Sequence, residues 1–138
     1  MIIRETDYAI RCVLHLAGKK DEVMMVNEIS RENNIPKSFL AKILQKLTRA
    51  EIVRSFRGVK GGYQIAKEPS EVDLLNIVET IQGPLVLNKC IVDRKACSRR
   101  NTCTVHPLWN IMVECMIDRL RGCSVDKLLA GDVPKGPM

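Results

Sequence analysis

Three cysteines and one histidine lie close together in the second half of the chain and could bind a soft metal centre. They are Cys90, Cys97, Cys103 and His106, within a stretch, 89–109, that shows neither helix nor strand periodicity. Thiolate and imidazole groups bind zinc and iron–sulfur clusters. Structural zinc sites usually pair ligands through C-x2–4-C knuckles, and both cysteine gaps here are wider. The spacing therefore favours an iron–sulfur cluster over zinc.

Basic residues stand between these ligands and would offset the negative charge of thiolate and sulfide. They are Lys89, Arg94, Lys95, Arg99 and Arg100. A metal-free thiol loop is disfavoured, because three exposed free cysteines without a role would be open to oxidation. Cys12, Cys115 and Cys123 stand on or beside predicted helices, where a lone cysteine is usually a small buried hydrophobe. We therefore leave these three out of the site.

The apolar pattern contains no membrane segment and no secretion signal. No apolar run approaches the roughly 20 residues that span a bilayer, and charge begins at Arg4, too early for a signal peptide. We expect a cytoplasmic protein that does not bind a membrane. Its six cysteines are then not expected to form disulfides, because cytoplasmic thiols are kept reduced.

Positive charge is concentrated before the cysteines. Residues 31–67 contain nine Lys or Arg and two acids, whereas the whole chain carries a net charge of +6. A basic block in an otherwise nearly neutral domain indicates a site for a polyanion such as DNA. A merely solvated surface would normally mix both signs.

Two helices joined by a tight turn lie inside this basic block. Apolar periodicity predicts helices over 5–18, 26–33 and 36–50. Thr6 or Asp7 is expected to cap the first helix and Asn27 the second. The buried stripe of the third helix is expected to be Phe39, Leu40, Ile43, Leu44 and Leu47. A short helix, a turn at Asn33-Asn34-Ile35-Pro36 and a longer basic helix form the helix-turn-helix pattern.

A predicted β-hairpin follows the third helix. Residues 52–57 and 63–66 flank the turn Gly58-Val59-Lys60-Gly61-Gly62. A hairpin directly after a recognition helix is a wing, whose glycine backbone can approach DNA closely. A nucleotide-phosphate cradle is excluded, because no helix with a Lys-Ser/Thr pair follows the glycines. The combination favours DNA binding over a winged helix that binds protein.

The residues expected to contact DNA lie on the third helix and in the wing. Bases are expected to be read near the start of the helix by Ser38, Ala41 and Lys42. Phosphates are expected to contact Lys37, Lys46, Arg49, Arg54, Arg57 and Lys60, and the backbone at Gly58, Gly61 and Gly62. Neutralising about six phosphates per subunit predicts binding that falls steeply with salt.

The chain is predicted to be mainly α with a small β-hairpin wing. Residues 1–83 form the winged helix-turn-helix DNA-binding region, which ends in a helix over 70–82 capped by Ser70 or Asp73. Residues 84–105, here called the cysteine loop, form the cluster-binding loop with the three cysteine ligands, and His106 follows it directly. Residues 106–131 contain a long dimerisation helix, preceded by a cap at Thr104, and a short helix capped by Ser124. The tail, 132–138, is expected to be flexible.

With these motifs the chain resembles the IscR/NsrR-type bacterial iron–sulfur transcription regulators. The resemblance rests on the opening Thr-Asp-Tyr-Ala-Ile-Arg, the helix-turn-helix, the wing from Arg57 to Tyr63, and Cys103-Thr-Val-His106-Pro-Leu-Trp109. It implies a homodimeric winged helix in which the long helix after the cysteine loop is the dimer contact. It also implies a cluster that reports iron–sulfur status, oxygen or nitric oxide to the DNA-binding surface.

The resemblance also implies the ligand set. In the IscR branch three cysteines and a histidine hold a 2Fe-2S cluster, which matches Cys90, Cys97, Cys103 and His106. In the NsrR branch an aspartate from the partner subunit completes a 4Fe-4S cluster, and Asp7 matches that position. His106 is favoured because it lies close to Cys103. Ser38 matches a base-contacting serine, but Ala41 stands where IscR has a glutamate, so the DNA sequence read need not be the same.

These features predict a dimeric iron–sulfur-sensing transcription regulator of palindromic operator DNA, with cluster state controlling DNA binding. The alternatives are a zinc- or thiol-based redox-sensing repressor on the same scaffold and a nitric-oxide sensor with a 4Fe-4S cluster. An electron carrier or enzyme is disfavoured, because the sequence offers no nucleophile–base pair, nucleotide cradle or substrate pocket. We expect no catalytic residue and no small-molecule substrate.

Overall fold

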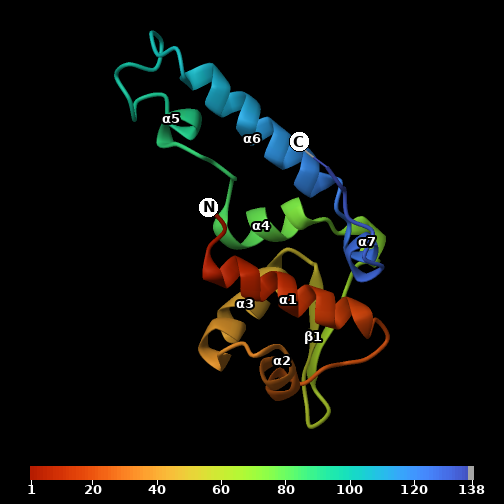
Figure 1. Cartoon of the computed structure of the whole chain (residues 1–138). Coiled ribbons are helices and arrows are strands. Elements are labelled where there is room, and N and C mark those ends of the chain that lie inside the picture. Colours follow the sequence, from red (N-terminus) through yellow and green to blue (C-terminus); the bar gives the residue numbers. More distant parts are fainter. Residues whose placement is uncertain (137–138) are drawn as a thin grey trace.

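The structure, a computed structural model, describes residues 1–136 and is mainly helical with one two-stranded hairpin (Figure 1). In chain order, its elements are α1 (Arg4–Gly18), α2 (Val26–Asn33), α3 (Lys37–Arg49), β1 (Val53–Phe56), β2 (Gly62–Ile65), the 3-10 turn η1 (Pro69–Glu71), α4 (Leu74–Gln82), α5 (Lys89–Val92), α6 (His106–Arg121) and α7 (Val125–Leu129). β1 and β2 pair antiparallel, with Val53 opposite Ile65. The predicted fold class is confirmed.

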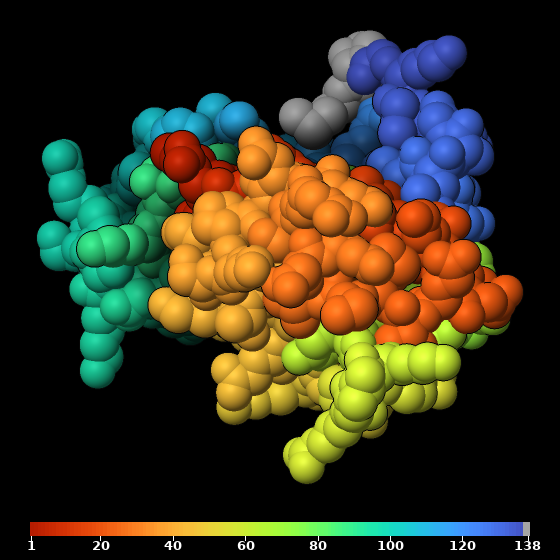
Figure 2. Space-filling view, turned by 90° about the horizontal axis from the view of Figure 1, so that it is seen from below, coloured from red at the N-terminus to blue at the C-terminus, as the bar shows by residue number. Residues whose placement is uncertain are grey.

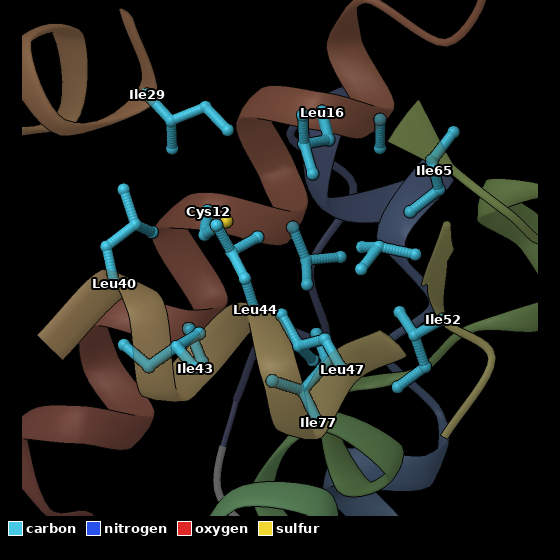
Figure 3. Packing of buried hydrophobic residues seen from close by; sticks show 14 of the residues in the cluster. Cys12, Leu16, Ile29, Leu40, Ile43, Leu44, Leu47, Ile52, Ile65 and Ile77 are labelled. Carbon is cyan, nitrogen blue, oxygen red and sulfur yellow. The ribbon is translucent and has the colours of Figure 1, made fainter. Parts of the chain in front are cut away.

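The core is aliphatic and is built around one face of α3. The buried side chains of that face are Leu40, Ile43, Leu44 and Leu47. Figure 3 shows them gathered with Cys12 and Leu16 of α1 and with Ile52 and Ile65 beside the hairpin. Full burial of one such aliphatic side chain contributes about 1.5–3 kcal/mol. This stripe therefore fixes which face α3 turns outward.

The C-terminal helix α7 returns to the body and packs against α1 (Figure 1). Val125, its first residue, is fully buried, and its backbone N–H donates to the Val72 carbonyl at 2.8 Å. The Leu74 N–H donates to the Cys123 carbonyl at 3.0 Å. These contacts join the start of α4 to the start of α7. The chain between these two points, which includes α5 and α6, therefore begins and ends on the same part of the body.

The helix α6 projects away from this body (Figure 1). Val113 is the buried residue of α6, whereas Leu108, Ile111 and Met112 expose 50%, 57% and 39% of their surface. Clustered apolar side chains on an exposed helix face are typical of a surface that packs on a partner. This apolar face of α6 is exposed in the single protomer.

Two predicted helix caps are wrong. α1 begins at Arg4, so Thr6 and Asp7 lie inside its first turn. The Thr6 hydroxyl instead donates to Gln82 Oε1 at 2.6 Å, a partner far away in sequence. α2 begins one residue before Asn27, which therefore lies inside the helix, and no side chain caps α2.

The cap of α4 is confirmed at Asp73, and the cap of α6 is shifted. The Asp73 side chain accepts from the Asn76 N–H at 2.8 Å, while the Asn76 side chain accepts from the Asp73 N–H at 3.1 Å. This reciprocal pair is a capping box. The residue before α6 is Val105 and not Thr104. Ser124 precedes α7 as predicted.

Phe39 is not part of the buried stripe. It keeps 38% of its surface exposed and packs edge-on against Tyr8, with ring centroids 5.5 Å apart. The stripe is narrower than predicted because Phe39 stands at its border, beside Tyr8 of α1.

One short helix lies in the cysteine stretch where none was predicted. This four-residue helix, α5, carries Cys90, whereas α6 begins at His106, where the predicted dimerisation helix begins. Cys12 is fully buried as predicted, but Cys115 and Cys123 are only half-buried. Residues 132–136 form neither helix nor strand, and 137–138 of the predicted flexible tail lie outside the described residues.

Candidate DNA-binding surface and cysteine loop

The turn between α2 and α3 is fixed by local hydrogen bonds. Asn34 adopts the left-handed conformation, with φ of 53°, which asparagine tolerates better than most residues. The Ile35 N–H donates to the Ser30 carbonyl at 3.0 Å, and the Ser30 hydroxyl donates to the Ile35 carbonyl at 2.6 Å. Ile35 is itself buried, so it anchors the turn in the core. The predicted helix-turn-helix is confirmed.

The outward face of α3 carries most of the predicted DNA-contacting side chains. Its exposed residues include Lys37, Ser38, Ala41, Lys42 and Arg49. Within the described residues, the side chains of Lys37, Lys42 and Arg49 form no hydrogen bond or ion pair, so their charge is available to a ligand. Figure 2 shows α2, α3 and the tip of the hairpin on one face of the molecule.

Lys46 differs from the other predicted phosphate contacts. Its ammonium lies 3.1 Å from Glu5 Oε1 on α1 and donates at 3.1 Å to the Ile81 carbonyl in the last turn of α4. The Lys46 side chain is 40% exposed and that of Glu5 is 21% exposed. Lys46 is therefore held within the protein rather than pointing freely outward.

The hairpin presents a basic tip. Arg57, Gly58 and Lys60 are all exposed at the turn. Arg54, on β1, is exposed too, and its guanidinium donates to the Ala66 carbonyl at 3.4 Å. The geometry is that of a wing beside a recognition helix, with positive charge at both.

Close backbone packing explains two of the wing glycines. A Cβ atom on Gly62 would collide with the Met24 carbonyl, and one on Gly61 would collide with the Phe56 carbonyl. Met24, between α1 and α2, exchanges two hydrogen bonds of 2.8 Å with Tyr63. The wing is thus attached to the helix-turn-helix by a short third strand-like pairing that the sequence did not predict.

The four predicted metal ligands lie along one segment but are not gathered together. Cys90 and Cys103 are half-buried, and Cys97 is exposed. Cys97 and Cys103 line one shallow hollow together with Arg99 and Thr104. Among residues 1–136, no three His, Cys, Asp or Glu side chains come close enough to hold a metal ion.

His106 is placed at the junction between the cysteine loop and α6. Its Nδ1 is buried and has no hydrogen-bond partner among the described residues. Its Nε2 faces the Asn110 side-chain nitrogen at 3.4 Å. A buried ring nitrogen without a partner is costly, and it is free to act as a ligand.

Asp7, the alternative fourth ligand, is paired with a basic residue of its own helix. Its carboxylate forms an ion pair of 2.6 Å with Arg11 on the same helix and is 51% exposed. The Arg11 guanidinium in turn lies 5.4 Å from the centre of the Tyr8 ring. A surface hollow beside Asp7 is lined by Arg4 and Arg11, two arginines of α1.

Sequence reasoning missed a group of contacts at the end of α4. Gln82 bonds to Thr6, which is 76 residues away in the chain, and Ile81 bonds to Lys46, which is 35 residues away. No local pattern announces either contact, because each residue type is ordinary for the helix on which it lies. Only the tertiary arrangement brings them together.

Comparison with known proteins identifies the family. The sequence model described as "Rrf2: Iron-dependent Transcriptional regulator" matches residues 2–131. The chain belongs to the Rrf2 family. It is 30% identical over 132 residues to a protein of Aquifex aeolicus described as an HTH-type transcriptional regulator, covering 94% of this chain and 92% of that protein.

Solved structures share the fold of this Rrf2-family chain. The structure of CymR, the global cysteine regulator of B. subtilis, matches with a TM-score of 0.79 and 20% identity, over 95% of this chain and 97% of that chain. The structure of T. potens IscR matches with a TM-score of 0.74 and 17% identity, over 99% and 93%. At these identities the likeness concerns the winged-helix fold.

Family membership establishes the general activity. As an Rrf2-family protein, the chain is a DNA-binding transcriptional regulator with a winged helix, and it is not an enzyme. None of its described helices combines the length and apolar character needed to cross a membrane. Resemblance to the IscR/NsrR type is confirmed at the level of the family.

The residues of the cysteine loop fit an iron–sulfur cluster by chemistry. Three thiols and the free His106 Nδ1 are the donor types that such clusters take. Because the described side chains are not gathered, ligation would require the loop to close around the centre. Binding and loop conformation would then be coupled.

Proposed function

We propose that this Rrf2-family regulator is a homodimer that senses an iron–sulfur cluster and binds palindromic operator DNA, with the state of the cluster controlling DNA binding. The observation that carries the proposal is the position of the four ligands. Cys90, Cys97 and Cys103 occupy the segment that joins the DNA-binding body to α6, and His106 is the first residue of α6. A change in that segment can therefore alter how the two parts are held.

The proposed ligand set favours a 2Fe-2S cluster held by the three cysteines and His106. A 4Fe-4S cluster completed by Asp7 of the partner subunit is the alternative. A cluster bound there would supply a centre that responds to iron supply, oxygen, nitric oxide or redox change. The chain's own contribution is to provide thiolates and an imidazole and to surround them with positive charge from Arg99 and neighbouring basic residues.

The proposed dimer uses the exposed apolar face of α6, formed by Leu108, Ile111 and Met112. Two copies related by a twofold axis would present two α3 helices to successive major grooves, roughly 34–36 Å apart. Ser38, Ala41 and Lys42 are proposed to meet the bases. Lys37, Arg49, Arg54, Arg57 and Lys60 are proposed to meet phosphates, and the backbone at Gly58, Gly61 and Gly62 to approach the DNA closely.

A second candidate function is a zinc- or thiol-based redox-sensing repressor on the same scaffold. It is favoured by the hollow that Cys97 and Cys103 share, since two thiols in one hollow can respond together to oxidation. The first experiment below separates the two.

The metal content of anaerobically purified protein tests the proposal. We expect a coloured protein with iron, sulfide and visible absorbance. His106→Ala should change the absorbance spectrum and speed cluster loss, whereas Asp7→Ala should not. His15→Ala and Asp21→Ala are the matched controls, because both lie outside the cysteine loop. A colourless protein containing zinc would overturn the iron–sulfur assignment, and a change on Asp7→Ala alone would reassign the fourth ligand.

DNA affinity tests the second half of the proposal. Operator DNA selected from random duplexes should be palindromic, and binding should differ between cluster-loaded and cluster-free protein. Affinity should fall steeply with salt, because about five phosphates per subunit are neutralised. Equal affinity in the two states would refute control by the cluster while leaving DNA binding intact.

A further inference from the structure

The last turn of α4 is the point at which the DNA-binding body ends and the cysteine loop begins. Its Ile81 carbonyl accepts a hydrogen bond from the Lys46 ammonium at 3.1 Å. The last carbonyls of a helix have no partner within the helix, and the helix dipole attracts cations there. Lys46, which belongs to the recognition helix α3, supplies that cation and is balanced by Glu5 at 3.1 Å.

The next residue, Gln82, ties the start of α1 to the same turn. Its Oε1 accepts from the Thr6 hydroxyl at 2.6 Å and from the Ile3 N–H at 3.2 Å, and its Nε2 donates to the Met1 carbonyl at 2.9 Å. Thr6 is fully buried. Loss of Gln82 would leave that buried hydroxyl without this partner, which is costly. We call the group Glu5, Thr6, Lys46, Ile81 and Gln82 the α4 clasp.

The chain runs directly from the α4 clasp into the cysteine loop. Gly83, with φ of 81°, ends the helix in a conformation that favours glycine. Leu85 is buried again, and Cys90 follows on α5. Only a short segment, in which Leu85 is the buried residue, therefore separates Cys90 from the α4 clasp, so a movement of Cys90 can reach the clasp.

We propose that Lys46 is a positioning residue, which transmits the state of the cysteine loop to the recognition helix through the α4 clasp, and does not contact DNA phosphate. Transmission rests on the proposed control of DNA binding by the loop. The physical basis is that one ammonium bonds simultaneously to α1 and to the end of α4 while its backbone belongs to α3. Closure of the loop that shifts Ile81 shifts the recognition helix with it.

The salt dependence of DNA binding tests whether Lys46 contacts a phosphate. The probe is Lys46→Gln, and the matched control is Lys37→Gln, at an exposed lysine of the same helix that is proposed to meet a phosphate. Lys37→Gln should lower the slope of log affinity against log salt by about 1 per subunit, whereas Lys46→Gln should leave it unchanged. An equal loss of slope in both variants would show that Lys46 touches DNA and would overturn the proposal.

The ratio of DNA affinities in the cluster-loaded and cluster-free states tests transmission. Allosteric coupling typically amounts to about 5–150-fold. Lys46→Gln should bring the ratio several-fold closer to one, and Lys46→Arg, which retains the cation, should restore it. A ratio that stays at the wild-type value in Lys46→Gln would overturn the proposal.

Amide hydrogen exchange separates failure of this inference from failure of the proposed function. If the wild type shows no difference between states, control by the cluster is wrong and the clasp is judged by exchange alone. Lys46→Gln and Thr6→Val should each speed exchange over 79–88 in the full chain, while Lys37→Gln should not. Unchanged exchange in both clasp variants would overturn the clasp itself.

Discussion

Cys12 and Cys97 are the same residue type in opposite surroundings. Cys12 lies in the core between α1 and α3, and burial raises the pKa of its thiol to about 12. Cys97 is exposed in the cysteine loop. Burial disfavours the charged thiolate, which is the reactive form. Cys12 is therefore a structural residue, and the exposed thiol is the one available for chemistry.

Iodoacetamide labelling checks this contrast. At pH 8 the folded apo protein should be alkylated at Cys97 within minutes, while Cys12 should be labelled only after unfolding in denaturant. Peptide mass spectrometry measures the two sites in one sample. Rapid alkylation of Cys12 in the folded state would contradict its place in the core.

Stability at high pH should also report Cys12. Its pKa is about 12 in the folded chain and 9.0 in the reference state, so the unfolded state loses the proton first. The contribution of the Cys12 thiol to the free energy of unfolding is fully present below pH 9. It falls between about pH 9 and 12, by at most ~1.4 kcal/mol per pH unit. Urea titrations should show a smaller alkaline slope in Cys12→Val, and an identical slope would contradict the assignment.

Single-residue roles were predictable where periodicity decides them. Ser38, Ala41 and Lys42 are exposed as helical spacing requires, and Cys12 is buried for the same reason. The engagement of Lys46 was not predictable, since Glu5 and Ile81 become its neighbours only when three helices pack. An exposed lysine and a clasping lysine look identical in a sequence.

At the scale of elements, the wing depends on its attachment to the segment before α2. Met24 and Tyr63 exchange two backbone hydrogen bonds across the point where Gly62 allows close approach. The attachment holds the basic hairpin tip at a fixed angle to the recognition helix. It therefore adds a backbone attachment between the wing and the helix-turn-helix, beside the packing of β2 on α1 and of β1 on α3.

Gly62→Ala should destabilise the protein by about 1–3 kcal/mol, as overpacking does, because backbone atoms cannot move aside easily. Operator affinity should fall as well, since the wing is displaced. Gly18→Ala is the control: its Cβ would meet nothing nearer than 3.9 Å, in a helix where alanine is preferred to glycine. Thermal unfolding measures both variants, and equal Tm values would refute the close-packing argument.

The main elements could be predicted from the sequence because each has an apolar pattern that repeats over many residues or is bounded by a clear turn. The helix-turn-helix, the hairpin and the Asp73 cap are confirmed. The helix α5 was missed, since four residues are too few to show periodicity, and the cap at Thr6 failed because α1 begins two residues earlier, at Arg4. The proposed gathering of the metal ligands could not be predicted from local patterns, because it would require the loop to close.

At the scale of the whole molecule, the exposed apolar face of α6 is the surface proposed to hold two copies of the chain together. Leu108, Ile111 and Met112 are exposed on a helix that projects from the body (Figure 1). Burying such a face against a second copy would remove apolar surface from water at roughly 25 cal/mol per Å2. The gain is the main driving force available to the proposed dimer.

Ile111→Asp should convert the proposed dimer to a monomer, because a carboxylate in a dry interface costs several kcal/mol. Sedimentation velocity measures the change, and operator affinity should fall with it. Val59→Asp is the matched control, since Val59 is 98% exposed at the wing tip and should leave the mass unchanged. A dimer that persists in Ile111→Asp would place the interface elsewhere.

The return of α7 to α1 has a consequence for how the chain could be divided. Residues 83–122 form an excursion that starts and finishes on the same body, where Leu74 bonds to Cys123 and Val125 is buried. The portion up to Gln82 therefore lacks a piece of its own core until the distal helix has been made. The DNA-binding body and the segment 83–122 are therefore not two independent domains joined by a linker. A chimera between homologues would have to exchange residues 83–122 alone and keep α7 with the DNA-binding body on which it packs.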